Sequence, residues 1–185
     1  MKKNTNPVIL VPVDFTELTE FATDHAIGIA KQLKATITLC HVINKDTKSM
    51  LKKQGLHLDS LFKLLQKNAL EIKDKHGIET DYMTREGSIF STIGQIAEES
   101  GAHILVMGTH GKIGVQHLIG SYALKVITSS PSPVIVVQKT RFHNEYKNIV
   151  LPIDYTSESK QKVKWAINIA RELKSTVHIF AVNDP

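Results

Sequence analysis

The stretch that decides the fold is "ILVMGTHGKIGVQHLIGSYALKVI", residues 104–127. A run of apolar residues leads into a helical pattern that opens at Ser121, and four glycines lie in or before the connecting loop: Gly108, Gly111, Gly114 and Gly120. In an open parallel sheet, ligands bind beyond the carboxyl ends of the strands, where the winding direction reverses. Glycine lets the backbone approach a ligand closely, and the free N–H groups of a helix start favour anions. The pattern therefore predicts a phosphate-binding loop between a strand and a helix, with simple turn-making as the alternative role of the glycines.

Apolar runs of this kind recur along the chain and alternate with helical patterns. The runs cover residues 8–13, 36–43, 103–108 and 133–138. Continuous apolar runs are typical of parallel strands whose two faces are both covered. Between them, apolar residues recur at helical spacing from Leu18 to Leu33 and from Leu58 to Ile72, and a third helix is expected over 88–100. We predict a three-layer α/β domain with a parallel sheet.

Two strands are candidates for the edges of this sheet. Residues 78–86 form a much more polar strand, which suits an edge because charged side chains discourage unwanted pairing. The run "PVIVV" at 133–137 carries no charge, yet it too would be an edge if the sheet is wound outward. We expect it to be covered, either by a second copy in a homodimer or by intramolecular pairing with a second domain.

The chain contains an internal repeat. Residues 148–183 align without a gap on residues 8–43, and 12 of the 36 pairs are identical, including Asp14 with Asp154 and Thr16 with Thr156. The repeat holds a first strand, a helix and a second strand only. We predict a first domain over 1–140, a linker over 141–146 and a partial second copy of the same fold over 147–185.

Composition limits the classes of function. The chain of 185 residues is 42% hydrophobic and 22% charged, as in ordinary globular proteins. No apolar run reaches the roughly 18 residues that cross a bilayer, and Asp14 follows the N-terminal apolar run too closely for a good signal peptide, so we expect a cytoplasmic protein without a membrane partner. The formal charge of +5 is spread among acidic residues and only 6% of the chain is aromatic, which disfavours nucleic acid. Cys40 lies in an apolar run and is expected to be a core residue in a reducing compartment.

Three segments together resemble the universal stress proteins of the nucleotide-binding kind. They are "PVDFTE" at 12–17, "CHVI" at 40–43 and "MGTHGKIGVQHLIGSYALKVITSSPSPVIVVQ" at 107–138. The resemblance covers residues 7–140, and again 146–185. It implies a doubly wound five-stranded parallel sheet of order 3-2-1-4-5 with helices on both faces, and pairing through the last strand. It also implies binding of ATP or another adenine nucleotide, with magnesium as its companion ion.

The resemblance further implies which residues bind the nucleotide. Asp14 and Val42 match the positions that hold ribose and adenine. We expect the same nucleotide site to include Pro12, Met107 and Tyr122. The phosphate loop is matched by Gly108, His110, Gly111, Gly120 and Ser121. Eight residues separate Gly111 from Gly120, where the family pattern has nine, so the loop is one residue short.

The residues themselves leave alternatives open. Asp14 is equally suited to cap the helix that begins near Thr16, with Glu17 completing an approximate capping box, and Ser121 is suited to cap its own helix. Three functions remain: a stress-response module that binds an adenine nucleotide, a dimerisation or partner-binding module of the same family without nucleotide, and a slow ATPase or adenylate-transferring enzyme. A nucleophile elbow, a Walker loop and a metal-spaced His/Cys cluster are all missing from the sequence, so we expect no catalytic or metal-ligating residues.

Overall fold

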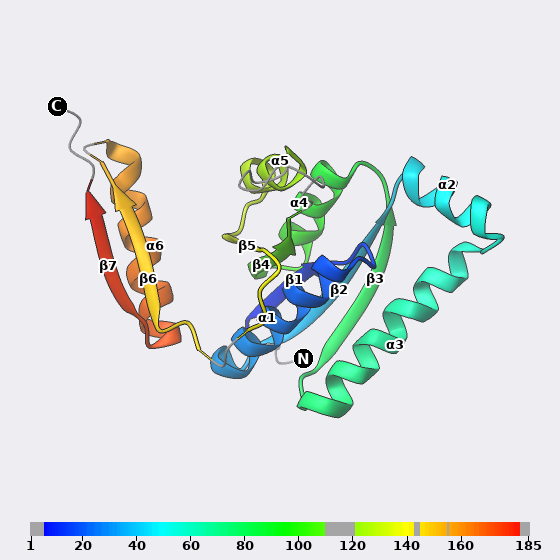
Figure 1. The fold of residues 1–185 in the computed structure, drawn as a ribbon, viewed down its shortest axis with the longest axis horizontal. Helices are drawn as coiled ribbons and strands as arrows, with labels where there is room; N and C mark the ends of the chain where they lie inside the picture. The colour runs from blue at the N-terminus through cyan, green and yellow to red at the C-terminus, as the bar shows by residue number, and fades with distance from the viewer. Residues whose placement is uncertain (1–5, 110–120, 143–144, 155, 182–185) are drawn as a thin grey trace. The chain divides into compact units, whose positions relative to one another are not determined.

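The computed structural model describes residues 6–109, 121–142, 145–154 and 156–181. The chain divides into two compact units, Met1–Arg141 and Phe142–Pro185. The first unit holds a five-stranded sheet and the second a two-stranded sheet (Figure 1). The predicted domain boundaries and linker stay predictions.

The sheet of the first unit is entirely parallel and has the order β3-β2-β1-β4-β5. This confirms the doubly wound five-stranded fold. The strands are β1 (Val8–Pro12), β2 (Thr36–Ile43), β3 (Thr80–Glu86), β4 (Ala102–Gly108) and β5 (Val134–Val137). The polar strand β3 lies at one edge as predicted, and the uncharged β5 lies at the other. What covers β5 remains a prediction.

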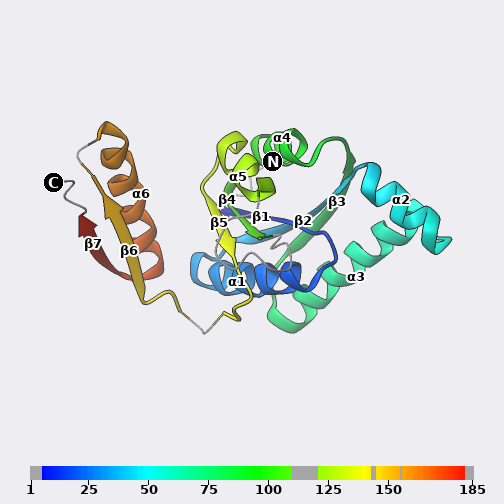
Figure 2. The same cartoon turned by 45° about the horizontal axis from the view of Figure 1, so that its top comes forward.

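Helices pack on both faces of this sheet. They are α1 (Glu17–Leu33), α2 (Lys45–Gln54), α3 (Leu58–His76), α4 (Ile89–Glu99) and α5 (Ser121–Ser129). Figure 2 shows α4 and α5 on one face, with α1 and α3 on the other. The core on the α4–α5 face is formed by side chains that alternate along the strands, as the two-residue period of a strand requires. Its buried members from the sheet are Leu10, Cys40, Val42, Ala102, Leu105 and Met107.

Helix α2 was not predicted from the sequence. Its segment "KDTKSMLKKQ" has only Thr47 and Leu51 buried, so the apolar stripe that marks a surface helix is almost missing. Local capping explains its start and end instead. The Asn44 side chain accepts a hydrogen bond from the Thr47 N–H, and Gly55 ends the helix in the left-handed conformation at φ 65°.

The second unit repeats the start of the first. It contains β6 (Asn148–Ile153), α6 (Ser157–Leu173) and β7 (Thr176–Ala181), with the two strands parallel. Pro152 pairs with Phe180, as Pro12 pairs with Cys40, so the register is the same at an offset of 140. Lys34 and Lys174 end the two equivalent helices with left-handed φ values of 54° and 53°. The internal repeat is therefore one of structure as well as sequence.

No helix in the described part of the chain is long and apolar enough to span a membrane.

Candidate functional site

A cavity of about 420 Å³ opens at the carboxyl ends of β1, β2 and β4. Its size is in the range of small-molecule sites. It is lined by residues of the β1–α1 connection, β2, the start of α2, α4 and the end of β4: Pro12, Val13, Asp14, Thr16, Leu18, Thr19, Cys40, His41, Val42, Asn44, Asp46, Thr47, Met50, Ile89, Ile93, Met107 and Gly108.

The position of this cavity follows from the strand order. The chain winds from β1 to β2 and β3 on one side, and then crosses to β4 and β5 on the other. The two connections that follow β1 and β4 therefore diverge at this end of the sheet, which is the topological switch point where open α/β sheets bind ligands. The sequence places a carboxylate after β1 and a glycine at the end of β4, at the two sides of this crevice.

Asp14 is held by a compact set of hydrogen bonds. Its Oδ1 accepts from the Thr16 N–H at 3.0 Å, from the Thr16 hydroxyl at 2.6 Å and from the Thr19 hydroxyl at 2.5 Å. The predicted capping box is wrong, because the N-cap residue of α1 is Thr16, and the Glu17 carboxylate pairs with Lys139 at 3.2 Å. Asp14 instead orders the turn before the helix, with its carboxylate on the cavity wall.

His41 lies beneath the same turn. It is 6% exposed, and its Nδ1 is 2.6 Å from the Val13 carbonyl oxygen. Its ring lies 5.0 Å from that of Phe15, which has a positive φ of 61°. Burial lowers the pKa of His41 below 6.5, although the Val13 carbonyl and the Asp14 carboxylate oppose this shift. The imidazole is therefore neutral at pH 7.

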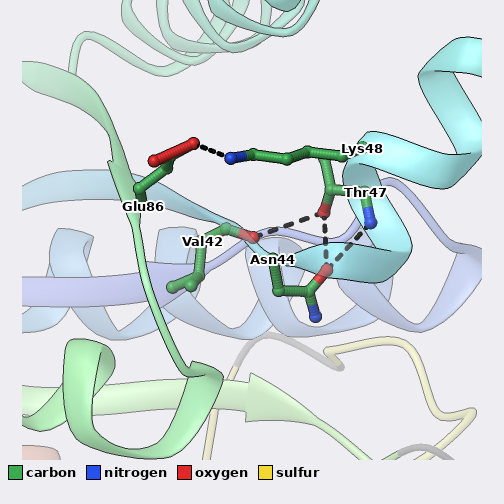
Figure 3. A network of polar contacts seen from close by, with 5 residues as sticks. All are labelled: Val42, Asn44, Thr47, Lys48 and Glu86. Atoms are coloured by element: carbon green, nitrogen blue, oxygen red, sulfur yellow. Dashed lines mark hydrogen bonds and ion pairs between the residues drawn. The ribbon is translucent and has the colours of Figure 1, made fainter.

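The start of α2 forms the opposite wall. Figure 3 shows the Thr47 hydroxyl between the Val42 carbonyl and the Asn44 side chain, at 3.4 and 3.1 Å. The Thr47 N–H also donates to Asn44 Oδ1 at 2.8 Å, and Lys48 forms an ion pair with Glu86 at the end of β3. These contacts fix the first turn of α2 to the ends of two strands.

The base of the cavity is apolar. Cys40, Val42, Ile93 and Met107 belong both to the core and to the cavity lining. Burial raises the pKa of the Cys40 thiol to about 12, so it stays protonated and acts as a small apolar residue, as predicted. An apolar base beside a carboxylate suits a ligand with an aromatic ring and hydroxyl groups.

Gly108 has a structural role that the sequence did not reveal. A Cβ atom at this position would lie 2.9 Å from the Leu18 carbonyl oxygen and 3.0 Å from the Leu18 Cβ. Glycine is therefore required here because α1 packs directly on the end of β4. The interpretation that Gly108 serves ligand approach is incomplete, since packing alone explains the residue.

The structure brings half of the predicted site residues together. Pro12, Asp14, Val42, Met107 and Gly108 all line the cavity. Ser121 begins α5 and Tyr122 follows it, whereas His110, Gly111 and Gly120 lie outside the described residues.

Sequence reasoning missed the second polar wall, formed by Asn44 and Thr47, and the buried His41 that lies between the two walls. The spacing of Asn44 and Thr47 is a recognisable N-cap signal, because an Asn side chain commonly accepts from the N–H three residues on. His41 lies within the quoted "CHVI" segment, but no local pattern indicates its contacts.

Comparison with known proteins agrees with this architecture. Residues 6–138 match the model of the universal stress protein family. The chain is 30% identical over 146 residues to the universal stress protein MJ0531 of Methanocaldococcus jannaschii, an alignment that covers 75% of this chain and 86% of that protein.

Solved structures extend the similarity to three dimensions. The structure of MJ0577 from the same organism is 30% identical, with a TM-score of 0.56 over 74% of this chain and 98% of that one. A universal stress protein solved in complex with cAMP shares the fold at 17% identity, with a TM-score of 0.55 over 73% of this chain and 98% of that one. A universal stress protein of Archaeoglobus fulgidus shares the fold at 16% identity, with a TM-score of 0.73 over 96% of this chain and 67% of that one. With its family match, its relatives and its fold in agreement, the chain belongs to the universal stress protein family.

Proposed function

We propose that this protein is a stress-response module that binds an adenine nucleotide in the cavity at the ends of β1, β2 and β4. The observation that carries the proposal is the placement of Asp14, Val42 and Met107 on one cavity at the switch point of the sheet. In this proposal the protein acts by binding the nucleotide and by dimerisation, and it catalyses no reaction of its own.

Each wall has a role toward such a ligand. The apolar base formed by Val42, Ile93 and Met107 would take the adenine ring, since a flat heteroaromatic ring gains most from apolar burial. The Asp14 carboxylate, a hydrogen-bond acceptor, would take the ribose hydroxyls. The phosphates would extend toward the start of α5 at Ser121, where free N–H groups and the helix dipole favour anions.

Magnesium would arrive with the phosphates. Among the described residues, no group of three or more His, Cys, Asp and Glu side chains is arranged to hold a metal ion. Magnesium is commonly bound by one or two carboxylates together with phosphate oxygens and water, and Asp46 is the carboxylate of the cavity lining that the ribose would leave available.

A solved relative supports the chemistry. The universal stress protein in complex with cAMP carries an adenine nucleotide on the same fold. The similarity to that protein supports the class of ligand and leaves the choice among ATP, AMP and cAMP to experiment.

The test is calorimetric titration of nucleotide-stripped protein with ATP, AMP, cAMP and GTP. Asp14→Ala should weaken adenine-nucleotide binding roughly 10- to 100-fold, since a hydrogen bond to a charged group contributes about 1.5–3 kcal/mol. Asp154→Ala is a matched control, because Asp154 accepts the same hydrogen bonds from Thr156 and Ser159 in the second unit. Equal affinity of wild type and Asp14→Ala would refute the assignment of Asp14.

A second function, partner binding through β5, is favoured by one observation. Val134–Val137 forms an edge strand with no charged residue, and an uncharged open edge invites strand pairing. Homodimerisation through this strand is compatible with nucleotide binding, because the cavity lies at the strand ends and β5 contributes none of its lining residues.

A further inference from the structure

Building on the proposed nucleotide site, we infer that His41 is a positioning residue that ties the two polar walls of the cavity to each other. One wall is the turn Val13–Thr19, which carries Asp14. The other is the first turn of α2 with its N-cap, residues 44–48. His41 lies on β2 between them and makes a hydrogen bond to each.

The first contact holds the Asp14 turn. His41 Nδ1 is 2.6 Å from the Val13 carbonyl oxygen, and Val13 directly precedes Asp14. Because a carbonyl oxygen only accepts, Nδ1 must carry the proton and donate. The Phe15 ring at 5.0 Å then packs against the imidazole, so the turn is held on both sides of the carboxylate.

The second contact holds α2. His41 Nε2 is 3.3 Å from the Thr47 hydroxyl oxygen. In the neutral imidazole with a proton on Nδ1, Nε2 is an acceptor, so the Thr47 hydroxyl donates to it. Asn44 Oδ1 at 3.1 Å and the Val42 carbonyl oxygen at 3.4 Å are alternative acceptors for the same hydroxyl proton, so His41 shares it with them.

The neutral form required by this arrangement is the one that the surroundings favour. His41 and Thr47 are both buried, and burial lowers the pKa of His41. Asp14 is the charged group that acts on the ring, and its effect is smaller than that of burial. The lowered pKa favours the neutral imidazole, and the Val13 carbonyl, which can only accept, selects the tautomer with the proton on Nδ1.

If His41 couples the two walls, a substitution that raises amide exchange in one wall should raise it in the other. Thr47→Val removes the hydroxyl at nearly constant volume and should accelerate amide exchange in the first turn of α2 roughly two- to tenfold, as expected for one net hydrogen bond. Because His41 transmits the change, amide exchange in residues 13–19 should also rise, although the Thr47 hydroxyl contacts His41, Val42 and Asn44, which lie outside this turn. Thr47→Ser restores the hydroxyl and should return both segments to wild-type rates.

Two changes at His41 separate its two bonds. His41→Asn keeps a donor near the Nδ1 position and should loosen α2 more, whereas His41→Gln keeps a polar group near Nε2 and should loosen the Asp14 turn more. His57→Gln is the matched control, because His57 is exposed before α3, its side chain makes no capping bond, and glutamine is not a favoured N-cap residue. Exchange in β4 serves as the internal reference within each variant.

The deciding experiment is amide hydrogen exchange on the ligand-free full chain, followed by titration with ATP. Faster exchange in both walls of Thr47→Val, rescued by Thr47→Ser, supports the inference; acceleration confined to α2 overturns it. If the wild type fails to bind adenine nucleotides, the proposed function is wrong, and the exchange data still decide whether His41 couples the walls. If the wild type binds ATP, Thr47→Val should lower the affinity for ATP several-fold, whereas Thr47→Ser should leave it unchanged.

Discussion

Gly108→Ala tests why a glycine ends β4. The added Cβ would lie 2.9 Å from the Leu18 carbonyl oxygen, 3.0 Å from the Leu18 Cβ and 3.1 Å from the Leu18 carbonyl carbon. Contacts this short with backbone atoms force α1 away from the sheet. Overpacking of this kind costs about 1–3 kcal/mol in the free energy of unfolding, which for a chain of this size is roughly 2–12 °C in Tm.

The assay is urea unfolding of the full chain, followed by circular dichroism, with Gly77→Ala as control. Gly77 has open space around its Cβ position but a φ of +67°, so alanine there should cost about 1 kcal/mol from backbone strain without moving α1. If Gly108 serves only ligand approach, Gly108→Ala will be as stable as the wild type and will lose nucleotide binding alone. A stability within about 0.5 kcal/mol of wild type, the usual range for a neutral surface change, would therefore refute the packing argument.

Three further predictions follow from buried groups and from the open edge. Burial lowers the pKa of His41 below 6.5 in the folded state, so the unfolded chain takes up a proton first as the pH falls. The free energy of unfolding should therefore drop from pH 6.5 downward. Parallel urea titrations at pH 8 and 5.5 should show a smaller drop in His41→Gln than in the wild type. The Cys40 thiol, with a pKa of about 12, should resist a thiol reagent at pH 8 in the folded protein and react at once in denaturant; rapid reaction without denaturant would contradict its burial. Charge placed on β5 by Ile135→Lys, at a half-buried residue outside the α4–α5 core, should reduce any dimer seen in sedimentation velocity, and a wild type that sediments as a monomer at all concentrations would exclude homodimerisation through β5.

The sequence predicted the parts of the fold that depend on local pattern. β2 covers the predicted residues 36–43, because its apolar run is bounded by polar residues. The polar β3 lies at an edge, where its side chains are exposed or only half-buried. Helix α2 escaped prediction because two caps and two buried residues, rather than an amphipathic stripe, hold it in place.

The site was predictable only in part for the same reason. Asp14, Val42 and Met107 lie at strand ends, so knowledge of the winding places them on one crevice. The role of Gly108 depends on Leu18, which is 90 residues away in the chain, and the role of His41 depends on Val13 and Thr47 together. Contacts between distant segments leave no periodic signal in the sequence, and they become visible only when the elements are packed.

The central claim is that the cavity at the ends of β1, β2 and β4 binds an adenine nucleotide. The most direct measurement is calorimetric titration of ATP, AMP and cAMP into nucleotide-stripped wild-type protein, beside Asp14→Ala and Asp154→Ala. We predict saturable binding of at least one adenine nucleotide to the wild type and to Asp154→Ala, and weakening of roughly 10- to 100-fold in Asp14→Ala. Absence of heat in the wild type at millimolar nucleotide, or equal affinities in all three proteins, would contradict the claim.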